Sequence, residues 1–101
     1  MSRGFTSMFA DDLNHLIDLK MSLGYSENTY LGRAFQFDRY CSSKYAETGN
    51  LTEGIVLNWL KPDSGESNSV IHSRAAFIRG FGTYLKSIGK NAYILPDKFT
   101  A

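Results

Sequence analysis

The stretch SNSVIHSRAAFIRGFGTYLKSIG, residues 67–89, is the most apolar helical pattern in the chain. At about 100° per residue, its apolar side chains cover roughly half of the helix circumference, which is more than a surface helix needs. These side chains are Val70, Ile71, Ala75, Phe77, Ile78, Phe81, Tyr84, Leu85 and Ile88. The pattern predicts that residues 67–89 form the last and most buried helix.

The same stretch is unusual in charge, because no carboxylate occurs between Glu66 and Asp97. The cations in this interval are Arg74, Arg79, Lys86 and Lys90. The helix begins with Ser67, Asn68 and Ser69, residue types that cap helix N-termini, where backbone N–H groups and the helix dipole also favour phosphate. Plain capping is the alternative, but the acid-free side of the helix favours an anionic partner.

Length and composition limit the remaining choices. The 101 residues, 43% of them hydrophobic, suit one domain, and a net charge of +1 gives no bulk signal for nucleic acid. Cys41 is the only cysteine, which argues against an internal disulfide or a cysteine-based zinc site. Neither a long apolar run nor a signal-peptide pattern is present, so we expect a cytoplasmic protein without a cofactor or a membrane partner.

The first predicted helix spans Met8 to Leu23, with Ser7 as its cap and Gly24 at its end, and residues 1–7 are expected to be a flexible lead-in. The apolar positions recur at three- and four-residue steps. Its outward side is expected to carry Asp11, Asp12, Asn14, His15 and Asp18. These acids would repel a polyanion, so this helix should face away from any nucleic acid.

The second predicted helix begins after the cap Ser26 and runs to about Tyr45. Its expected buried stripe is Tyr30, Leu31, Ala34, Phe37, Cys41 and Tyr45, with Phe35 at the margin. The opposite arc holds Thr29, Arg33, Gln36, Tyr40, Ser43 and Lys44, with Arg39 at its edge. Solvated helix faces usually mix both signs of charge, so an arc without acids favours a binding role over simple solvation.

Two charged residues break these patterns. Asp38 projects toward the apolar stripe of the second helix, and Arg74 falls within the apolar arc of the last. Because unpaired charges are not left buried, we hypothesise an Asp38–Arg74 ion pair that joins the two helices. If that pair does not form, Arg74 is expected to point outward and meet phosphate.

A short third helix is predicted from Glu53 to about Lys61, capped by Thr52, with Trp59 as an aromatic centre of the core. Residues 90–96 indicate an extended tail. No phosphate loop, metal-ligand pair or nucleophile motif is present, so we expect neither catalytic residues nor a metal site, and no enzyme activity in this chain.

The order and spacing of several short fragments resemble the N-terminal core-binding, or SAM-like, domain of tyrosine recombinases, the phage integrase family. The fragments are Phe9 with Leu13 and Leu16, residues 24–30 (GYSENTY), residues 35–41 (FQFDRYC), Leu51-Thr52 with Val56, Trp59 and Leu60, residues 67–69 with Arg74, residues 78–85 (IRGFGTYL) and residues 93–96 (YILP). The sequence departs from the family pattern at Gly80 and Gly82, where larger residues are common.

The resemblance implies an all-α, four-helix core-binding bundle over residues 8–95 with a short extended C-terminal tail, and residues 96–101 as the start of a linker. It implies a parent recombinase whose separate C-terminal catalytic domain carries the tyrosine nucleophile, with double-stranded DNA and further recombinase protomers as partners. It also implies a bacterial or phage-encoded protein that acts at the nucleoid. In that family the second and fourth helices approach the major groove. The implied DNA-binding residues are Ser26, Asn28, Thr29, Arg33, Ser69, His72, Arg74 and Arg79.

The alternative function is a helical protein–protein interaction domain without nucleic-acid binding. In that case Tyr25, Tyr40 and Tyr93, together with the cationic faces, would form the partner surface. The sequence leaves both functions open.

Overall fold

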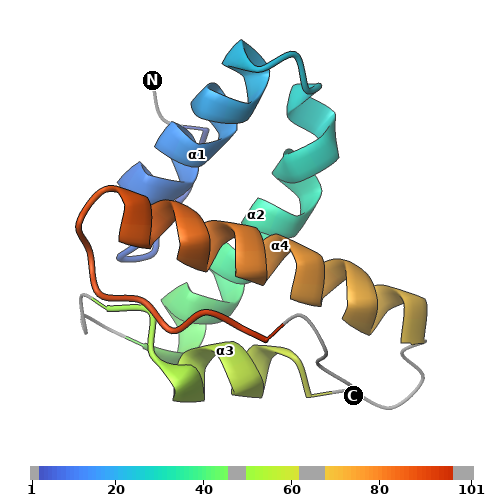
Figure 1. Cartoon of the computed structure of the whole chain (residues 1–101). Coiled ribbons are helices and arrows are strands. Elements are labelled where there is room, and N and C mark those ends of the chain that lie inside the picture. The colour runs from blue at the N-terminus through green and yellow to red at the C-terminus, as the bar shows by residue number, and fades with distance from the viewer. Residues whose placement is uncertain (1–2, 46–49, 62–67, 97–101) are drawn as a thin grey trace. The chain divides into compact units, whose positions relative to one another are not determined.

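The computed structural model describes residues 3–45, 50–61 and 68–96, and the regular structure within these ranges is entirely α-helical (Figure 1). The helices are α1 (Ala10–Ser22), α2 (Glu27–Lys44), α3 (Glu53–Trp59) and α4 (Asn68–Ser87). The prediction of an all-α fold is confirmed. The chain divides into two compact units, Met1–Gly49 and Asn50–Ala101. Each unit is described separately.

In the first unit, α1 and α2 run antiparallel and are joined by a tight turn (Figure 1). Gly24 follows α1 with a φ of +99°, a conformation that side chains disfavour. The Tyr25 amide donates back to the Lys20 carbonyl at 3.0 Å, which satisfies the helix end. Ser26 then caps α2, as predicted, by accepting a hydrogen bond from the Asn28 amide at 3.3 Å.

The core of the first unit consists of apolar side chains from one side of each helix. Those buried are Phe9, Leu13, Leu16, Ile17, Ala34, Phe37 and Cys41, with Phe5 from the preceding segment. The rings of Phe9 and Phe37 lie 5.7 Å apart between centroids. The two helices therefore pack through the apolar stripes that their spacing predicts, although Tyr30, Leu31, Phe35 and Tyr45 are only half-buried.

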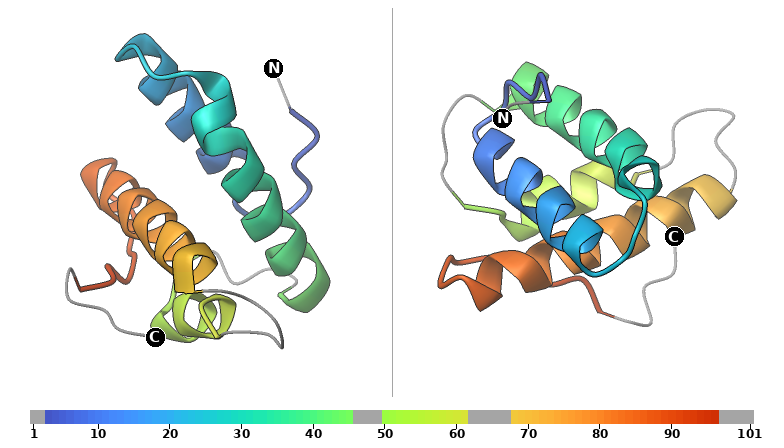
Figure 2. Two further views of the ribbon diagram at one scale, coloured as in Figure 1. Left: turned by 90° about the vertical axis from the view of Figure 1, so that its right-hand side faces the viewer. Right: turned by 90° about the horizontal axis from the view of Figure 1, so that it is seen from above.

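The segment before α1 is more closely packed than its aperiodic sequence suggests. We expected residues 1–7 to be a flexible lead-in, but the described part, residues 3–7, runs beside α2 (Figure 2). Phe5 is buried with its ring 4.7 Å from that of Phe35. The backbone amides of Thr6 and Ser7 donate to the Asp38 carboxylate at 2.9–3.1 Å. We refer to residues 3–7 as the N-terminal strap.

Fewer of the polar residues on the predicted outward side of α1 are exposed than expected. Asp11, His15 and Asp18 are exposed, but Asp12 and Asn14 are buried, with only 7% and 8% exposure, so this part of the prediction was wrong. Asn14 is covered because its side-chain oxygen accepts a hydrogen bond from Arg3 of the strap at 2.9 Å. A segment without periodicity gave no sign that it would cover a helix.

In the second unit, α3 begins as predicted, because the Thr52 hydroxyl accepts a hydrogen bond from the Ile55 amide at 3.2 Å. Trp59 is 5% exposed and packs edge to face on Phe77, with ring centroids 6.2 Å apart. The buried residues of this unit are Leu51, Ile55, Val56, Trp59, Leu60, Ile71, Ala75, Phe77, Ile78, Phe81, Leu85 and Leu95. Trp59 thus lies in the core, as its size predicts.

After α4 the chain turns back as an extended tail (Figure 1). The Tyr93 amide donates to the Leu51 carbonyl at 2.8 Å, and Leu95 is buried. A Cβ placed on Gly82 would lie 2.8 Å from the Tyr93 carbonyl oxygen, closer than real Cβ atoms approach. α4 remains continuous through Gly80 and Gly82, and the absence of a side chain at Gly82 lets the tail lie against the helix. Ile88, predicted as part of the buried arc, follows the end of α4 and is 45% exposed.

Candidate nucleic-acid interface

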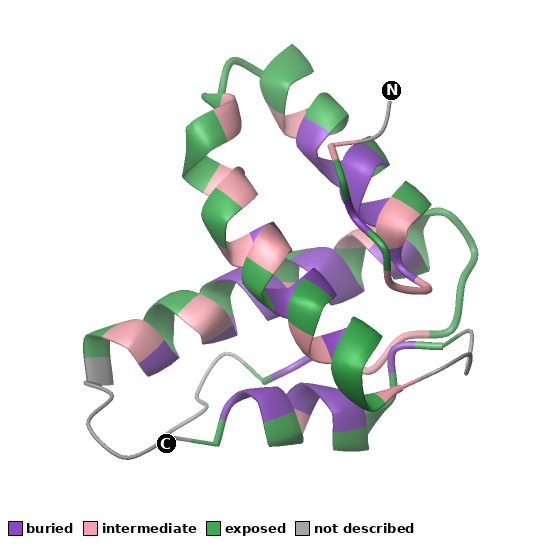
Figure 3. Ribbon diagram, turned by 180° about the vertical axis from the view of Figure 1, so that it is seen from behind, coloured by how far each residue is buried: buried purple, intermediate pink, exposed green. Residues whose placement is uncertain are grey.

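The α2 part of the predicted site lies at the surface of the first unit. Ser26, Asn28 and Thr29 are exposed around the first turn of α2 (Figure 3). The Ser26 hydroxyl oxygen accepts the Asn28 amide but can still donate its own proton to an anion. The backbone start of α2 and these three short polar side chains therefore lie together.

Arg33 follows one turn later and is half-buried. Its Nη1 donates to the Gln36 side-chain oxygen at 2.7 Å, which holds the guanidinium along the helix surface. The residues on this side of α2, which we call the α2 flank, are Thr29, Arg33, Gln36, Arg39, Tyr40, Ser43 and Lys44. All of them are exposed or half-buried, so the arc without acids is at the surface of its unit.

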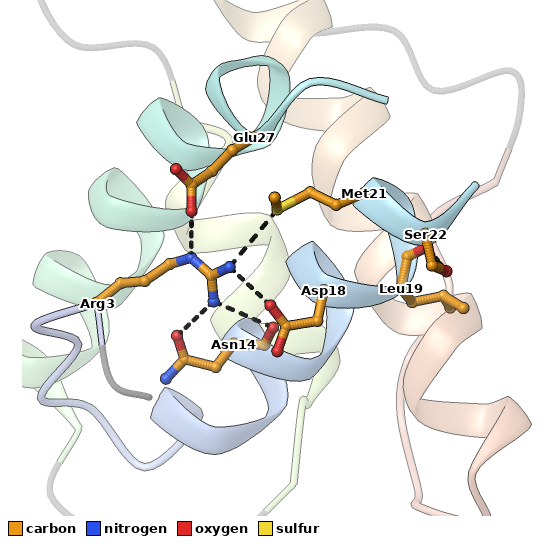
Figure 4. A network of polar contacts seen from close by, with 7 residues as sticks. All are labelled: Arg3, Asn14, Asp18, Leu19, Met21, Ser22 and Glu27. Carbon is orange, nitrogen blue, oxygen red and sulfur yellow. Dashed lines mark hydrogen bonds and ion pairs between the residues drawn. The ribbon is translucent and has the colours of Figure 1, made fainter. Parts of the chain in front are cut away.

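The acid nearest to the start of α2 has a local partner. Glu27 accepts a hydrogen bond from Nε of Arg3 at 2.8 Å, and Nη2 of the same guanidinium lies 2.7 Å from Asp18 (Figure 4). Nη1 of Arg3 donates to the Asn14 side-chain oxygen at 2.9 Å. The hydrogen bond from Arg3 holds the pKa of Asp18 below its usual value and raises that of Arg3. One arginine thus pairs with two carboxylates and offsets one of their two negative charges.

Asp38 is 4% exposed and accepts three hydrogen bonds from the Thr6 and Ser7 amides. Backbone N–H donors satisfy a buried carboxylate well, so its place in the apolar stripe is explained within the first unit. In the second unit, the Arg74 guanidinium lies 5.6 Å from the ring centroid of Trp59, and its Nη1 lies 3.5 Å from the Trp59 carbonyl oxygen. The hypothesised Asp38–Arg74 ion pair is not needed to explain either residue and stays a prediction.

The α4 part of the predicted site is less uniform. Ser69 and His72 are exposed. Arg79 lies on the same side of α4, but its Nε donates to the Leu95 carbonyl at 3.2 Å and its Nη2 to the Pro96 carbonyl at 2.8 Å. Arg74 lies among the apolar positions, on Trp59. Ser67 is outside the described residues, and of Asn68 only the backbone is described.

Sequence reasoning missed the two side chains that organise the polar surface near the α1–α2 turn. One is Arg3, which stands alone in an aperiodic segment and therefore carries no pattern. The other is Lys20, whose Nζ lies 5.6 Å from the ring centroid of Tyr25 and 5.7 Å from that of Tyr30. The spacing from Lys20 to Tyr25 across a glycine turn was the only available signal.

Comparison of the chain with family models, curated proteins and solved structures finds no significant match. The resemblance to the tyrosine recombinases therefore rests on the residues alone.

The described residues contain no cluster of three or more His, Cys, Asp or Glu side chains that could hold a metal ion. In the same ranges, none of the helices has the length and hydropathy to cross a membrane. Burial, and next the charge of Asp38, raise the pKa of the Cys41 thiol to about 12. The thiol is therefore protonated at neutral pH.

Proposed function

We propose that this chain is a DNA-binding module, the core-binding domain of a site-specific tyrosine recombinase, and that it grips the sugar-phosphate backbone. The observation that carries the proposal is the α2 flank together with its surroundings. Cations, hydroxyls and an amide are exposed along it, while the carboxylates Glu27 and Asp38 on the same helix are engaged by Arg3 and by backbone amides.

The mode of binding follows from these groups. The Ser26 and Thr29 hydroxyls and the Asn28 amide can donate hydrogen bonds to phosphate oxygens at the positive end of α2. Arg33, Arg39 and Lys44 would neutralise further phosphates along the helix. Such contacts fix the position on the duplex but carry little sequence information, so binding is expected to be mainly independent of sequence.

On α4, the exposed Ser69 and His72 remain candidates for the same role. Arg79 and Arg74 are weaker candidates, because their guanidinium groups contact backbone carbonyls of their own unit. The proposal therefore gives the α2 flank the larger share of the affinity.

The experiment is a titration of the chain with generic duplex DNA across a salt series. With roughly four to six phosphates neutralised, log K should fall against log salt with a slope of about −4 to −5. Arg33→Ala should weaken binding on any sequence and reduce that slope by about 1, while the melting temperature changes little. Lys61→Ala, an exposed cation after α3, is the matched control. Binding that ignores salt would contradict the proposal.

A protein partner is the second candidate, and one observation favours it. Four large apolar side chains near the α1–α2 turn are exposed: Leu19 at 43%, Met21 at 44%, Leu23 at 63% and Tyr25 at 51%. Backbone amide shifts during the DNA titration distinguish the two functions. Shifts centred on the first turns of α2 support DNA binding, whereas no shifts at low salt favour a protein partner.

A further inference from the structure

The N-terminal strap places a single cation, Arg3, against Glu27, the first residue of α2, and against Asp18 of α1. Three nitrogens of the Arg3 guanidinium are used: Nε toward Glu27, Nη1 toward Asn14 and Nη2 toward Asp18 (Figure 4). Nη2 also lies 3.7 Å from the Met21 sulfur. The Arg3 side chain is only 16% exposed, although its carboxylate partners are 60% and 41% exposed. Arg3 is thus a built-in counterion rather than a cation displayed to solvent.

The position of Glu27 gives this arrangement a consequence for binding. Glu27 is the first residue of α2 and lies in sequence between Ser26 and Asn28, both proposed phosphate contacts. An uncompensated carboxylate there, with Asp18 beside it, would repel phosphate within the Debye length of about 10 Å at 0.1 M salt. Arg3 of the strap can therefore affect phosphate binding without contacting the phosphate.

We infer that Arg3 is a positioning residue for phosphate binding: it offsets one of the two negative charges of Asp18 and Glu27 and so weakens their repulsion of an anion at the start of α2. The inference rests on the proposed function. It assigns to residues 3–7 an electrostatic role in addition to packing, because Phe5 and the Thr6 and Ser7 amides anchor the segment independently of Arg3. The anchored strap brings the guanidinium to the carboxylates.

The test compares the affinities of the wild type and of Arg3 and Lys61 variants for duplex DNA at about 0.01 M salt. At this concentration the Debye length is about 30 Å, and local charges act most strongly. Arg3→Gln should weaken binding about two- to fivefold, and the loss should shrink as salt is raised. Lys61→Gln also removes one positive charge, after the end of α3, and should weaken DNA binding less than Arg3→Gln does. Arg3→Lys keeps the charge without the forked guanidinium and should stay close to the wild-type affinity.

Rescue separates the electrostatic role from a structural one. In the triple variant Arg3→Gln, Asp18→Asn, Glu27→Gln, the repelling carboxylates are also removed, so affinity should return to the wild-type value or exceed it. If Arg3 acts only by holding the strap, the triple variant should bind as weakly as Arg3→Gln. An Arg3→Gln variant that binds no more weakly than Lys61→Gln would also overturn the inference.

Failure of the two proposals can be told apart. If the wild-type chain binds no duplex DNA at low salt, the proposed function fails. If the wild type binds but the rescue does not occur, only the role of Arg3 fails. Should Arg3→Gln not fold, as judged by helical circular dichroism, the double variant Asp18→Asn, Glu27→Gln decides with Arg3 in place. It should bind more tightly than the wild type, and unchanged affinity would overturn the inference.

Discussion

The two units hold their irregular segments in place with different hydrogen-bond acceptors. In each, an irregular segment packs against helices: the N-terminal strap in the first unit and the tail after α4 in the second. The strap is held by carboxylates, since Asp18 and Glu27 bind Arg3 and Asp38 binds two amides. The tail is held by backbone carbonyls, which accept from the Tyr93 amide and from Arg79.

This difference changes how an acid-free helix should be interpreted. Arg74 and Arg79 of α4 have no acids nearby in sequence, but carbonyl oxygens of Trp59, Leu95 and Pro96 serve as their acceptors. The absence of acids on α4 is therefore partly explained within the second unit, where carbonyl oxygens take the place of carboxylates as acceptors. On α2 the same absence coincides with an exposed flank, which makes it the better sign of an external anion.

The largest effect is expected where the strap is anchored. Asp38→Ala removes a buried acceptor of two amides and should lower the free energy of unfolding of the first unit by about 2–3 kcal/mol. Reactivity of the single, buried Cys41 thiol during urea unfolding reports on this unit. Asp11→Ala, an exposed acid on α1, should change it by no more than about 0.5 kcal/mol. Equal effects would mean that the carboxylate does not anchor the strap.

A glycine pair in α4 tests how closely the tail must approach. Gly82→Ala would place a Cβ against the Tyr93 carbonyl and should destabilise the second unit by about 1–2 kcal/mol, because backbone must move. Gly80→Ala has no atom within 4 Å of the added Cβ and should instead stabilise it by up to about 1 kcal/mol. Fluorescence of Trp59 measures both. A stabilising Gly82→Ala would refute the close approach.

The arginine that holds the tail should contribute less. Arg79→Ala removes two hydrogen bonds to partly exposed carbonyls. It should lower the free energy of unfolding of the second unit by about 1 kcal/mol, as measured by Trp59 fluorescence. This predicts a lower melting temperature for Arg79→Ala than for Arg33→Ala, whose hydrogen bond to Gln36 is exposed. An unchanged melting temperature of Arg79→Ala would contradict this role in holding the tail and would make Arg79 a stronger candidate for a phosphate contact.

The smallest effect is expected in acid for the Arg3–Asp18 pair, in which the Asp18 side chain is exposed. Because hydrogen bonding to Arg3 lowers the pKa of Asp18 in the folded chain, its contribution to stability is present above the ordinary value of 3.8. It is lost as the pH falls through the lower folded value. The difference in stability between the wild type and Arg3→Gln in a urea series should therefore be largest above pH 3.8 and narrow as the pH falls through the lower folded value. Curves with a constant gap would contradict the pairing.

Local chemistry made several features predictable. The caps Ser26 and Thr52, the stop at Gly24 and the buried stripes follow from side-chain hydrogen bonding, backbone freedom and helical periodicity, which act within a few residues. The exposed α2 flank follows in the same way. The burial of Asn14 could not be predicted, because Arg3, from a segment without periodicity, hydrogen-bonds to its side chain.

By itself, the sequence determined which segments are helical, where α2 and α3 begin and which sides are mainly apolar, since these depend on contacts within one or two turns. The predicted start of the first helix was wrong: it was expected at Met8 after the cap Ser7, but α1 begins at Ala10 with Phe9 at its N-cap position and no capping side chain. Only the tertiary structure decided the partners of the charged residues. Arg3, Asp38, Arg74 and Arg79 meet groups 11 to 32 positions away in sequence. A charge has no periodic signature, so its acceptor is known only when the chain has folded.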